Sequence, residues 1–160
     1  MANPKIRIKV EGFGEMCAEL YPDVAPVTVE NFMSLVRAKF FDGLIFHRVI
    51  PGFMIQGGDP LGNGMGGAEK NIKGEFKANG HNNPIKHERG VISMARAFDP
   101  NSASSQFFIM HADAPHLDGQ YAAFGKVISG MEAVDEIASI PTDYNDRPKI
   151  AVRIKKAYID

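Results

Sequence analysis

The chain of 160 residues contains no tryptophan and only one cysteine, and its formal net charge is −1. A single cysteine cannot form a disulfide within the chain. Because no second cysteine or nearby histidine supports a reactive thiol, we interpret Cys17 as a small strand residue. A charge balance near zero provides no basic surface for nucleic acid and no acidic tail for a basic partner. No apolar run approaches the ~18 residues of a membrane-spanning helix. The sequence therefore predicts neither nucleic-acid binding nor membrane insertion.

We do not expect the N-terminal segment to be an export signal. The alternating residues Ile6, Ile8 and Val10 follow the first five residues directly. They leave no space for the apolar stretch of about 7–15 residues that a signal peptide requires, so we expect a cytoplasmic protein. The length suits one domain, and we expect residues 1–160 to form it, because no linker or internal repeat interrupts the pattern. Nothing in the pattern signals oligomerisation, and a monomer is expected.

Short apolar runs of strand character dominate the chain, and only two segments follow helical spacing. The expected strands lie at residues 6–10, 16–21, 46–50, a stretch beginning at 53, 91–95, 106–110, 124–127 and 150–159, and the expected helices at 26–39 and 131–138. The strands do not alternate with helices, which excludes a parallel α/β sheet. Closure would remove the exposed edges of so many short strands. We therefore predict a mainly β fold, a closed eight-stranded antiparallel β-barrel with two α-helices.

The most informative run, residues 46–59, reads FHRVIPGFMIQGGD. It places a cation (Arg48), two large apolar side chains (Phe53 and Met54) and an amide (Gln56) within nine positions. A cation beside apolar surface must find acceptors or face an open cleft, and Gln56 is a candidate acceptor. The pattern suits a mostly apolar ligand that carries one or two amide groups.

Strand alternation predicts which side chains of this run lie together. The side chains of Phe46, Arg48 and Ile50 are expected on one face, and those of His47 and Val49 on the other. The Pro-Gly pair that follows is expected to turn the chain into a second extended stretch.

The pattern Gly62-x-Gly64-x-x-Gly67 matches a dinucleotide-binding fingerprint in its spacing only. No strand leads into it and no long helix follows, because Gly74 and Pro84 interrupt the region. The glycines and asparagines of residues 60–90 instead predict a long loop region, and loops of this length in a compact domain are usually functional or mobile. We therefore predict no nucleotide cofactor.

Metal binding and hydrolysis are also not supported by the sequence. The chain has five histidines: His47, His81, His87, His111 and His116. None has the close Cys or His spacing of a metal site, and no histidine–carboxylate spacing suggests a catalytic triad. The serines at 104–105 lack a Gly-x-Ser-x-Gly turn. The sequence therefore predicts no metal ion, no cofactor and no hydrolase activity.

Three blocks of the sequence resemble the motifs of the cyclophilin family. Residues 46–59 resemble its main signature, residues 105–109 (SQFFI) its second motif and residues 117–127 (LDGQYAAFGKV) its third. The blocks follow the family's order at about its spacing, and no segment from Ile6 to Ile159 fits it badly. The resemblance implies a closed eight-stranded barrel with two helices. It also implies peptidyl-prolyl cis-trans isomerase activity, in a short single-domain form of bacterial type.

The same resemblance implies roles for individual residues. Arg48 is the expected catalytic residue, and the expected partners are proline-containing peptides and unfolded or flexible protein segments. The expected proline pocket is formed by Phe53, Met54, Phe108 and Leu117. The other expected substrate-binding residues are His47, Gln56, Gly64, Ala95, Arg96, Ala97, Gln106, His116 and Tyr121.

Three positions depart from the family's pattern. His116 stands where many members carry a tryptophan that helps to bind cyclosporin, so we expect cyclosporin to bind only weakly. Tyr121 stands where many members carry histidine. Arg96 replaces a more usual asparagine, and its positive charge predicts a preference for acidic peptides.

The sequence is also compatible with two other functions. The same groove could hold proline-containing segments with little turnover, as a binding module or chaperone. Alternatively, an eight-stranded barrel could carry a small molecule in its interior. Arg48 favours the enzyme, because a pure binding module does not need it, and the large apolar residues on most strands favour a filled interior.

Overall fold

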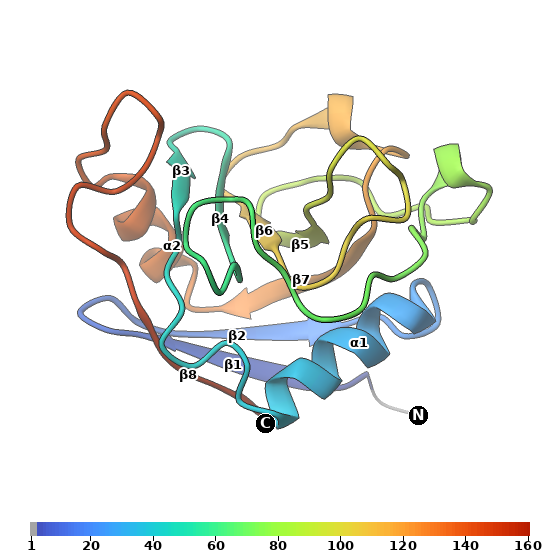
Figure 1. Cartoon of the computed structure of the whole chain (residues 1–160), viewed down its shortest axis with the longest axis horizontal. Coiled ribbons are helices and arrows are strands. Elements are labelled where there is room, and N and C mark those ends of the chain that lie inside the picture. The colour runs from blue at the N-terminus through green and yellow to red at the C-terminus, as the bar shows by residue number, and fades with distance from the viewer. Residues whose placement is uncertain (1–2) are drawn as a thin grey trace.

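The computed structural model describes residues 3–160 and shows one sheet of eight antiparallel strands with two α-helices (Figure 1). The strands are β1 (Lys5–Val10), β2 (Gly14–Leu20), β3 (Arg48–Ile50), β4 (Met54–Gly57), β5 (Val91–Met94), β6 (Phe107–Met110), β7 (Ala123–Ser129) and β8 (Ile154–Ile159). The helices are α1 (Pro26–Arg37) and α2 (Met131–Ala138), and short 3-10 turns lie at Lys77–Asn79 and Pro115–Leu117. The predicted mainly β class with two α-helices is confirmed.

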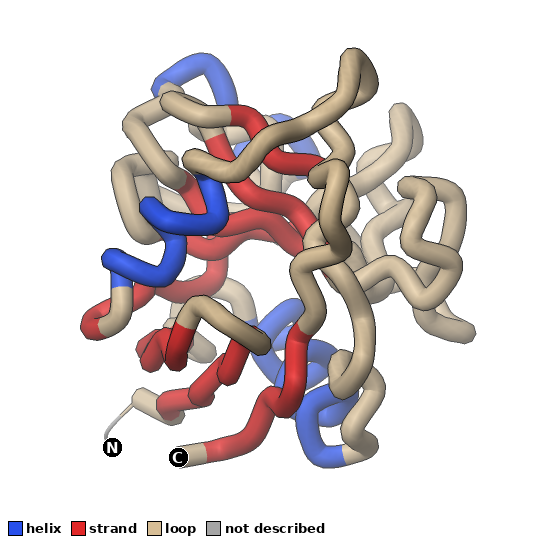
Figure 2. Tube along the Cα trace, turned by 90° about the vertical axis from the view of Figure 1, so that its left-hand side faces the viewer, coloured by secondary structure: helices blue, strands red, loops and turns tan. Residues whose placement is uncertain are grey.

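The sheet does not close into a barrel. Its order is β3-β4-β6-β5-β7-β2-β1-β8, so β3 and β8 are the edges, and β1 and β8 run side by side at one end of the molecule (Figure 2). The segment before β3 meets the start of β8 through an isolated bridge between Ile45 and Arg153 and a 2.9 Å hydrogen bond from Phe46 N to Val152 O. Phe46 and Val49 both pack in the main core, and a separation of three residues does not follow the alternation of a strand. The predicted closed barrel is therefore wrong, and the sheet is an open half-barrel.

Aromatic side chains fill the interior of the half-barrel. Helix α1 begins at Pro26, whose missing N–H costs nothing in a first turn. The residues that α1 buries follow helical spacing: Thr28, Val29, Phe32, Met33 and Val36. The ring of Phe32 lies 4.9 Å from that of Phe41, 5.3 Å from that of Phe107 and 5.0 Å from that of Phe124. This packing argues against a small-molecule carrier.

Alternation along β4 and β6 separates a second apolar cluster from this core. Ile55 and Phe107 face the main core, whereas their neighbours Met54 and Phe108 face the opposite side of the sheet. The second cluster also includes Val91, Met110, Ala114, Leu117 and Ala123, and it is covered by Ile50, Phe53, Ile85, Ala95 and Tyr121. Most of the predicted proline-pocket residues belong to this cluster, so the sheet itself positions them.

Several element boundaries differ from those expected, among them one end of α1 and one end of β8. Helix α1 ends at Arg37 rather than near Lys39, which has a left-handed φ of 59°. Strand β8 begins at Ile154 rather than Ile150, which is 84% exposed. Residues 141–149 form a loop in which a bridge joins residues 142 and 148. The strand therefore begins only after this loop. Between residues 3 and 160, no helix is long and apolar enough to cross a membrane.

Candidate active site

Arg48 and Gln56 face each other across the hairpin of β3 and β4. They are register partners, and Arg48 Nη1 donates to Gln56 Oε1 at 3.4 Å. This is the acceptor role that the sequence predicted for Gln56. The expectation that Phe46 shares a face with Arg48 is wrong, because Phe46 lies outside β3 and packs in the main core with Val49, while Arg48 is exposed. The cation therefore sits at the rim of the outer apolar cluster.

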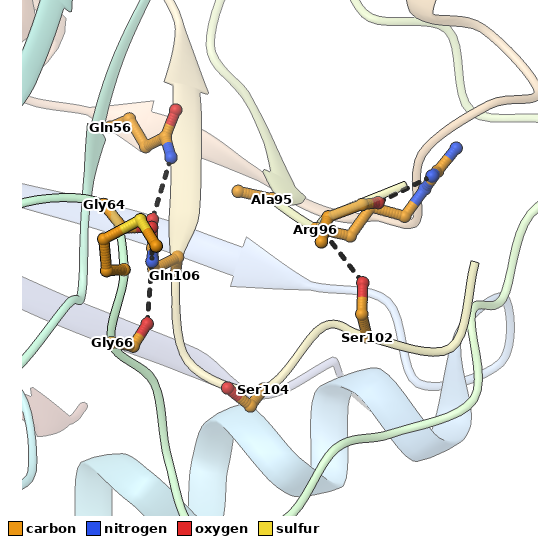
Figure 3. A pocket seen from close by; sticks show the side chains of 10 residues that line it. Gln56, Gly64, Gly66, Ala95, Arg96, Ser102, Ser104 and Gln106 are labelled. Atoms are coloured by element: carbon orange, nitrogen blue, oxygen red, sulfur yellow. Dashed lines mark hydrogen bonds between the residues drawn. The ribbon is translucent and has the colours of Figure 1, made fainter. Parts of the chain in front are cut away.

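A chain of side-chain amides continues from Gln56 into the long loop. Gln56 Nε2 donates to Gln106 Oε1 at 3.0 Å. Gln106 Nε2 in turn donates to the carbonyl oxygens of Gly64 at 3.0 Å and Gly66 at 2.7 Å (Figure 3). Each amide has its oxygen and nitrogen occupied, so the network assigns the orientation of both. The position of the Arg48 guanidinium is thereby tied to the loop.

Asp59 organises that loop from beneath. It is buried, and its carboxylate accepts hydrogen bonds from the backbone N–H groups of Leu61 at 2.8 Å, Asn63 at 3.0 Å and Gly64 at 2.6 Å. Burial alone would raise the pKa of Asp59, but the backbone donors, including that of Gly66, hold it below its ordinary value. A side chain at Gly66 would collide with this carboxylate. Gly62 and Gly64, which belong to the pattern that mimics a nucleotide fingerprint, have positive φ values of 68° and 88° and so allow the loop to wrap around Asp59.

A cavity of about 130 Å³ lies beside Arg48 on the outer cluster, and we call it the apolar cavity because most of the side chains that line it are apolar. Its lining residues come from β3, β4, β6 and the segments that follow β5 and precede β7: Arg48, Phe53, Met54, Gln56, Ala95, Arg96, Phe108, Leu117 and Tyr121. The rings of Phe108 and Tyr121 meet edge to face, with centroids 5.7 Å apart. A cavity of this size has room for a small apolar ring, with a guanidinium and an amide at its edge.

A second cavity of about 240 Å³ adjoins the first, and we call it the polar cavity because amide and hydroxyl side chains contribute to its lining (Figure 3). Its lining residues are Gln56, Gly64, Met65, Gly66, Ala95, Arg96, Ala97, Ser102, Ser104 and Gln106. Three residues, Gln56, Ala95 and Arg96, line both cavities, which together form one elongated groove. Met65, Gly66, Ser102 and Ser104 are absent from the sequence prediction, because they lie in loops without a regular pattern.

Arg96 does not point into the groove. Its guanidinium lies 4.8 Å from the ring centres of both Phe76 and Tyr121. It donates to the carbonyl oxygen of Gln120 at 2.8 Å and to that of Ala97 at 3.0 Å, and it turns away from the Gln106 side of the cavity (Figure 3). The side chain therefore joins the loop after β5 to the loop before β7.

The structure also contains a Ser–His–Asp chain, with a buried serine and a buried histidine, that the sequence did not predict. His87 Nε2 lies 2.9 Å from Ser93 Oγ, and His87 Nδ1 lies 3.1 Å from Asp118 Oδ1. No spacing in the sequence points to this pairing, because a loop brings together residues that are 31 positions apart. Ser93 is fully buried and cannot reach a substrate, so the chain is not a hydrolytic triad. It supports Phe108 instead, whose ring stacks on that of His87 at 6.0 Å.

Two predicted site residues lie outside both cavities. His47 is buried beneath the loop, close to Gly64, and its Nδ1 has no hydrogen-bond partner in the described chain. Burial lowers the pKa of His47, and the nearby carboxylate of Asp59 only partly opposes this. His116 is exposed, but its ring lies 5.8 Å from that of Phe53 at the cavity's edge. All the other predicted site residues line one or both cavities.

The comparisons with known proteins agree on one family. The family model for cyclophilin type peptidyl-prolyl cis-trans isomerase/CLD matches residues 5–159. The peptidyl-prolyl cis-trans isomerase ppi1 of Schizosaccharomyces pombe is 44% identical over 158 residues, which cover 98% of each chain. A peptidyl-prolyl cis-trans isomerase of Acinetobacter baylyi is 42% identical over 167 residues, covering 96% of this chain and 84% of its own.

A solved structure extends the agreement to the fold. The crystal structure of a cyclophilin type isomerase of Cryptosporidium parvum, determined in the presence of the dipeptide Ala-Pro, matches with a TM-score of 0.90 and 35% identity. The match covers 98% of each chain. The chain belongs to the cyclophilin family of peptidyl-prolyl cis-trans isomerases, as its three motifs predicted.

Proposed function

We propose that this protein accelerates rotation about Xaa–Pro peptide bonds, with the proline ring in the apolar cavity and Arg48 acting on the rotating amide. The observation that supports this proposal is the position of Arg48, which lies at the rim of that cavity and opposite Gln56. No carboxylate between residues 3 and 160 forms a salt bridge with its guanidinium. Its remaining donors can therefore serve a substrate.

The chemistry requires neither a nucleophile nor a metal ion. The barrier to rotation is about 18–20 kcal/mol, and it arises from amide resonance. In the twisted transition state the nitrogen regains its lone pair and the carbonyl becomes less polar. A donor aimed at that nitrogen therefore stabilises the twisted state more than the planar one, and an apolar cavity penalises the twisted state less.

Arg48 suits the donor role because its guanidinium stays protonated across the working pH range. One hydrogen bond to a charged group contributes about 1.5–3 kcal/mol. That corresponds to roughly ten- to a hundred-fold in rate. The remainder of any enhancement comes from holding both sides of the bond while water is excluded: Phe53, Met54, Phe108 and Leu117 against the ring, and Gln56 on a carbonyl.

The substrates we propose are proline-containing peptides and flexible segments of proteins. The adjoining polar cavity, lined by Gln106 and the serines at 102 and 104, provides room and hydrogen-bonding groups for residues next to the proline. Cyclosporin is proposed to bind only weakly, because an imidazole at His116 offers less apolar surface than an indole. The protein is proposed to act as a monomer.

The test is two-dimensional NMR exchange on a short Ala-Pro peptide with catalytic amounts of protein. We expect exchange cross-peaks with the intact chain, at least ten-fold slower exchange with Arg48→Ala, and partial activity with Arg48→Lys, which keeps the charge but not the planar fork. Peptide shifts that report binding without acceleration by any form would instead support a proline-binding module or chaperone. Equal rates with all three forms would remove Arg48 from the mechanism.

A further inference from the structure

A small cluster outside the groove joins helix α2 to the turn that carries Phe53. His111, directly after β6, lies between the two. The backbone N–H of Gly52, in the turn, donates to His111 Nδ1 at 2.8 Å. On its other side, His111 Nε2 lies 3.2 Å from Oδ1 of Asp135 in α2. One imidazole therefore connects a helix to a tight turn of the site.

These two contacts define the protonation state of the ring. A nitrogen that accepts a hydrogen bond carries no proton, so Nδ1 of His111 is bare and Nε2 holds the proton that faces Asp135. Only the neutral imidazole makes both bonds. When the ring gains a second proton, Nδ1–H points at the N–H of Gly52, and two donors face each other. The contact with Asp135 survives protonation, but the contact with Gly52 does not.

The charged groups around His111 favour this selective response. Arg89 holds Asp135 with two hydrogen bonds of 2.7 Å and donates to the carbonyl oxygen of His111 at 2.9 Å. The Arg89 hydrogen bond lowers the pKa of Asp135, so this carboxylate stays ionised beside the ring. Asp113, which accepts from the backbone N–H of Arg89, is the other carboxylate of the cluster. Asp135 thus anchors the imidazole on the α2 side in either protonation state.

The turn is attached to the segment directly after β6 through two of its groups, the carbonyl oxygen of Phe53 and the N–H of Gly52, and only the second contacts a side chain that can titrate. The carbonyl oxygen of Phe53 accepts from the backbone N–H of His111 at 2.9 Å, which protonation leaves unchanged. The second point is the bond from Gly52 to the imidazole. Between the two attachments lies Phe53, whose side chain lines the apolar cavity.

We propose that His111 is a positioning residue for the proline cavity and that its protonation releases the turn at Gly52, which weakens the binding of proline-containing peptides in acid. The inference rests on the proposed function in one respect, because it takes Phe53 to contact the proline ring.

The first test follows the backbone amide of Gly52 by NMR between pH 8 and pH 5.5. We expect its shift to follow the titration of the His111 ring in the intact chain and to stay constant in His111→Asn. The asparagine oxygen lies close to the position of Nδ1 and accepts the same bond without titrating. An amide that ignores the titration of His111 would overturn the switch and leave the proposed function untouched.

The second test measures KM and kcat for an Ala-Pro peptide over the same pH range. In the intact chain KM is expected to rise about three- to ten-fold toward low pH, the scale of one ordinary hydrogen bond, with little change in kcat. His111→Asn should keep the low KM at every pH, and His111→Phe, which lacks the acceptor, should keep the high KM at every pH. His81→Asn, which removes an imidazole that contacts Val24 instead, should behave like the intact chain.

The two readouts separate the possible failures. A pH dependence of KM that survives in His111→Asn would overturn the role of His111. A Gly52 amide that follows His111 while peptide affinity stays constant would overturn the link from the turn to the cavity, and it would also count against Phe53 as a proline contact.

Discussion

Gln56 and Gln106 are joined by a single hydrogen bond, from Nε2 of the first to Oε1 of the second at 3.0 Å. The outer ends of the two amides are occupied as well, by Arg48 on one side and by the carbonyl oxygens of Gly64 and Gly66 on the other. Because an amide has one accepting and one donating end, the order of donors along this chain has a fixed direction. The loop over the polar cavity and the guanidinium at the apolar cavity are therefore mechanically connected.

Gln106→Glu should break this connection. A carboxylate has no N–H to offer the carbonyls of Gly64 and Gly66, so acceptor would face acceptor and the loop would shift. We expect kcat/KM in the NMR exchange assay to fall about ten-fold, the scale of one unsatisfied partly buried group. Asn71→Asp makes the same chemical change at an exposed position and should leave the rate unchanged. An equal loss in both variants would point to charge alone.

His87 should make the fold sensitive to acid. Burial lowers its pKa in the folded chain, despite the hydrogen bond and charge of Asp118, whereas in the unfolded chain it has the ordinary value of about 6.5. Below that value the unfolded state binds more protons, so the free energy of unfolding falls as pH drops from about 6.5 toward the lower folded pKa. Urea unfolding between pH 8 and pH 5 should show this fall.

The variants that check it are His87→Gln and His116→Gln. His87→Gln should be less stable at pH 8, because Ser93 and Asp118 lose their partner, but its stability should depend less on pH. His116 is exposed, and its replacement should leave the pH dependence of the free energy of unfolding unchanged. If the free energy of unfolding depends on pH as strongly in His87→Gln as in the intact chain, the acid sensitivity belongs to other groups. Buried His47 is the first of these to test.

The sequence predicted the strands and the cavity residues well because both depend on local pattern. Alternation along β4 and β6 places Met54 and Phe108 together, and the register of β3 with β4 places Arg48 beside Gln56. Closure of the barrel could not be judged in this way. It depends on whether the segment before β3 keeps a strand's alternation, and the packing of both Phe46 and Val49 in the main core shows that it does not.

Contacts between loop residues could not be predicted from the sequence, for a different reason. His87 and Asp118 are 31 positions apart and lie in irregular segments, so no periodicity relates them. The glycines after Asp59 had a recognisable spacing, but their purpose is to let backbone N–H groups approach a buried carboxylate. Spacing alone could not distinguish that purpose from phosphate binding.

Gly66→Ala tests the packing of the loop around Asp59. The new methyl group would overlap the Asp59 carboxylate and crowd Leu61, so the loop must move. We expect the free energy of unfolding to fall by about 1–3 kcal/mol, as for other overpacked sites, and KM for the Ala-Pro peptide to rise. In a double-mutant cycle with Asp59→Ala, the combined loss should be smaller than the sum, because the overlapping group is gone. Additive losses would show that Gly66 is required for another reason.

Arg96 should give the groove a mild preference for acidic peptides, although its donors already bind carbonyl oxygens. Its charge is not neutralised by a salt bridge to any carboxylate in residues 3–160, and it borders both cavities. An exposed ion pair contributes about 0.2–1 kcal/mol, so a peptide with Glu next to the Ala-Pro pair should bind roughly two- to five-fold more tightly than one with Lys. The ratio should shrink at 1 M salt, where the Debye length is about 3 Å. Arg96→Gln should abolish it, and equal affinities for the two peptides with the intact chain would limit Arg96 to bracing the two loops.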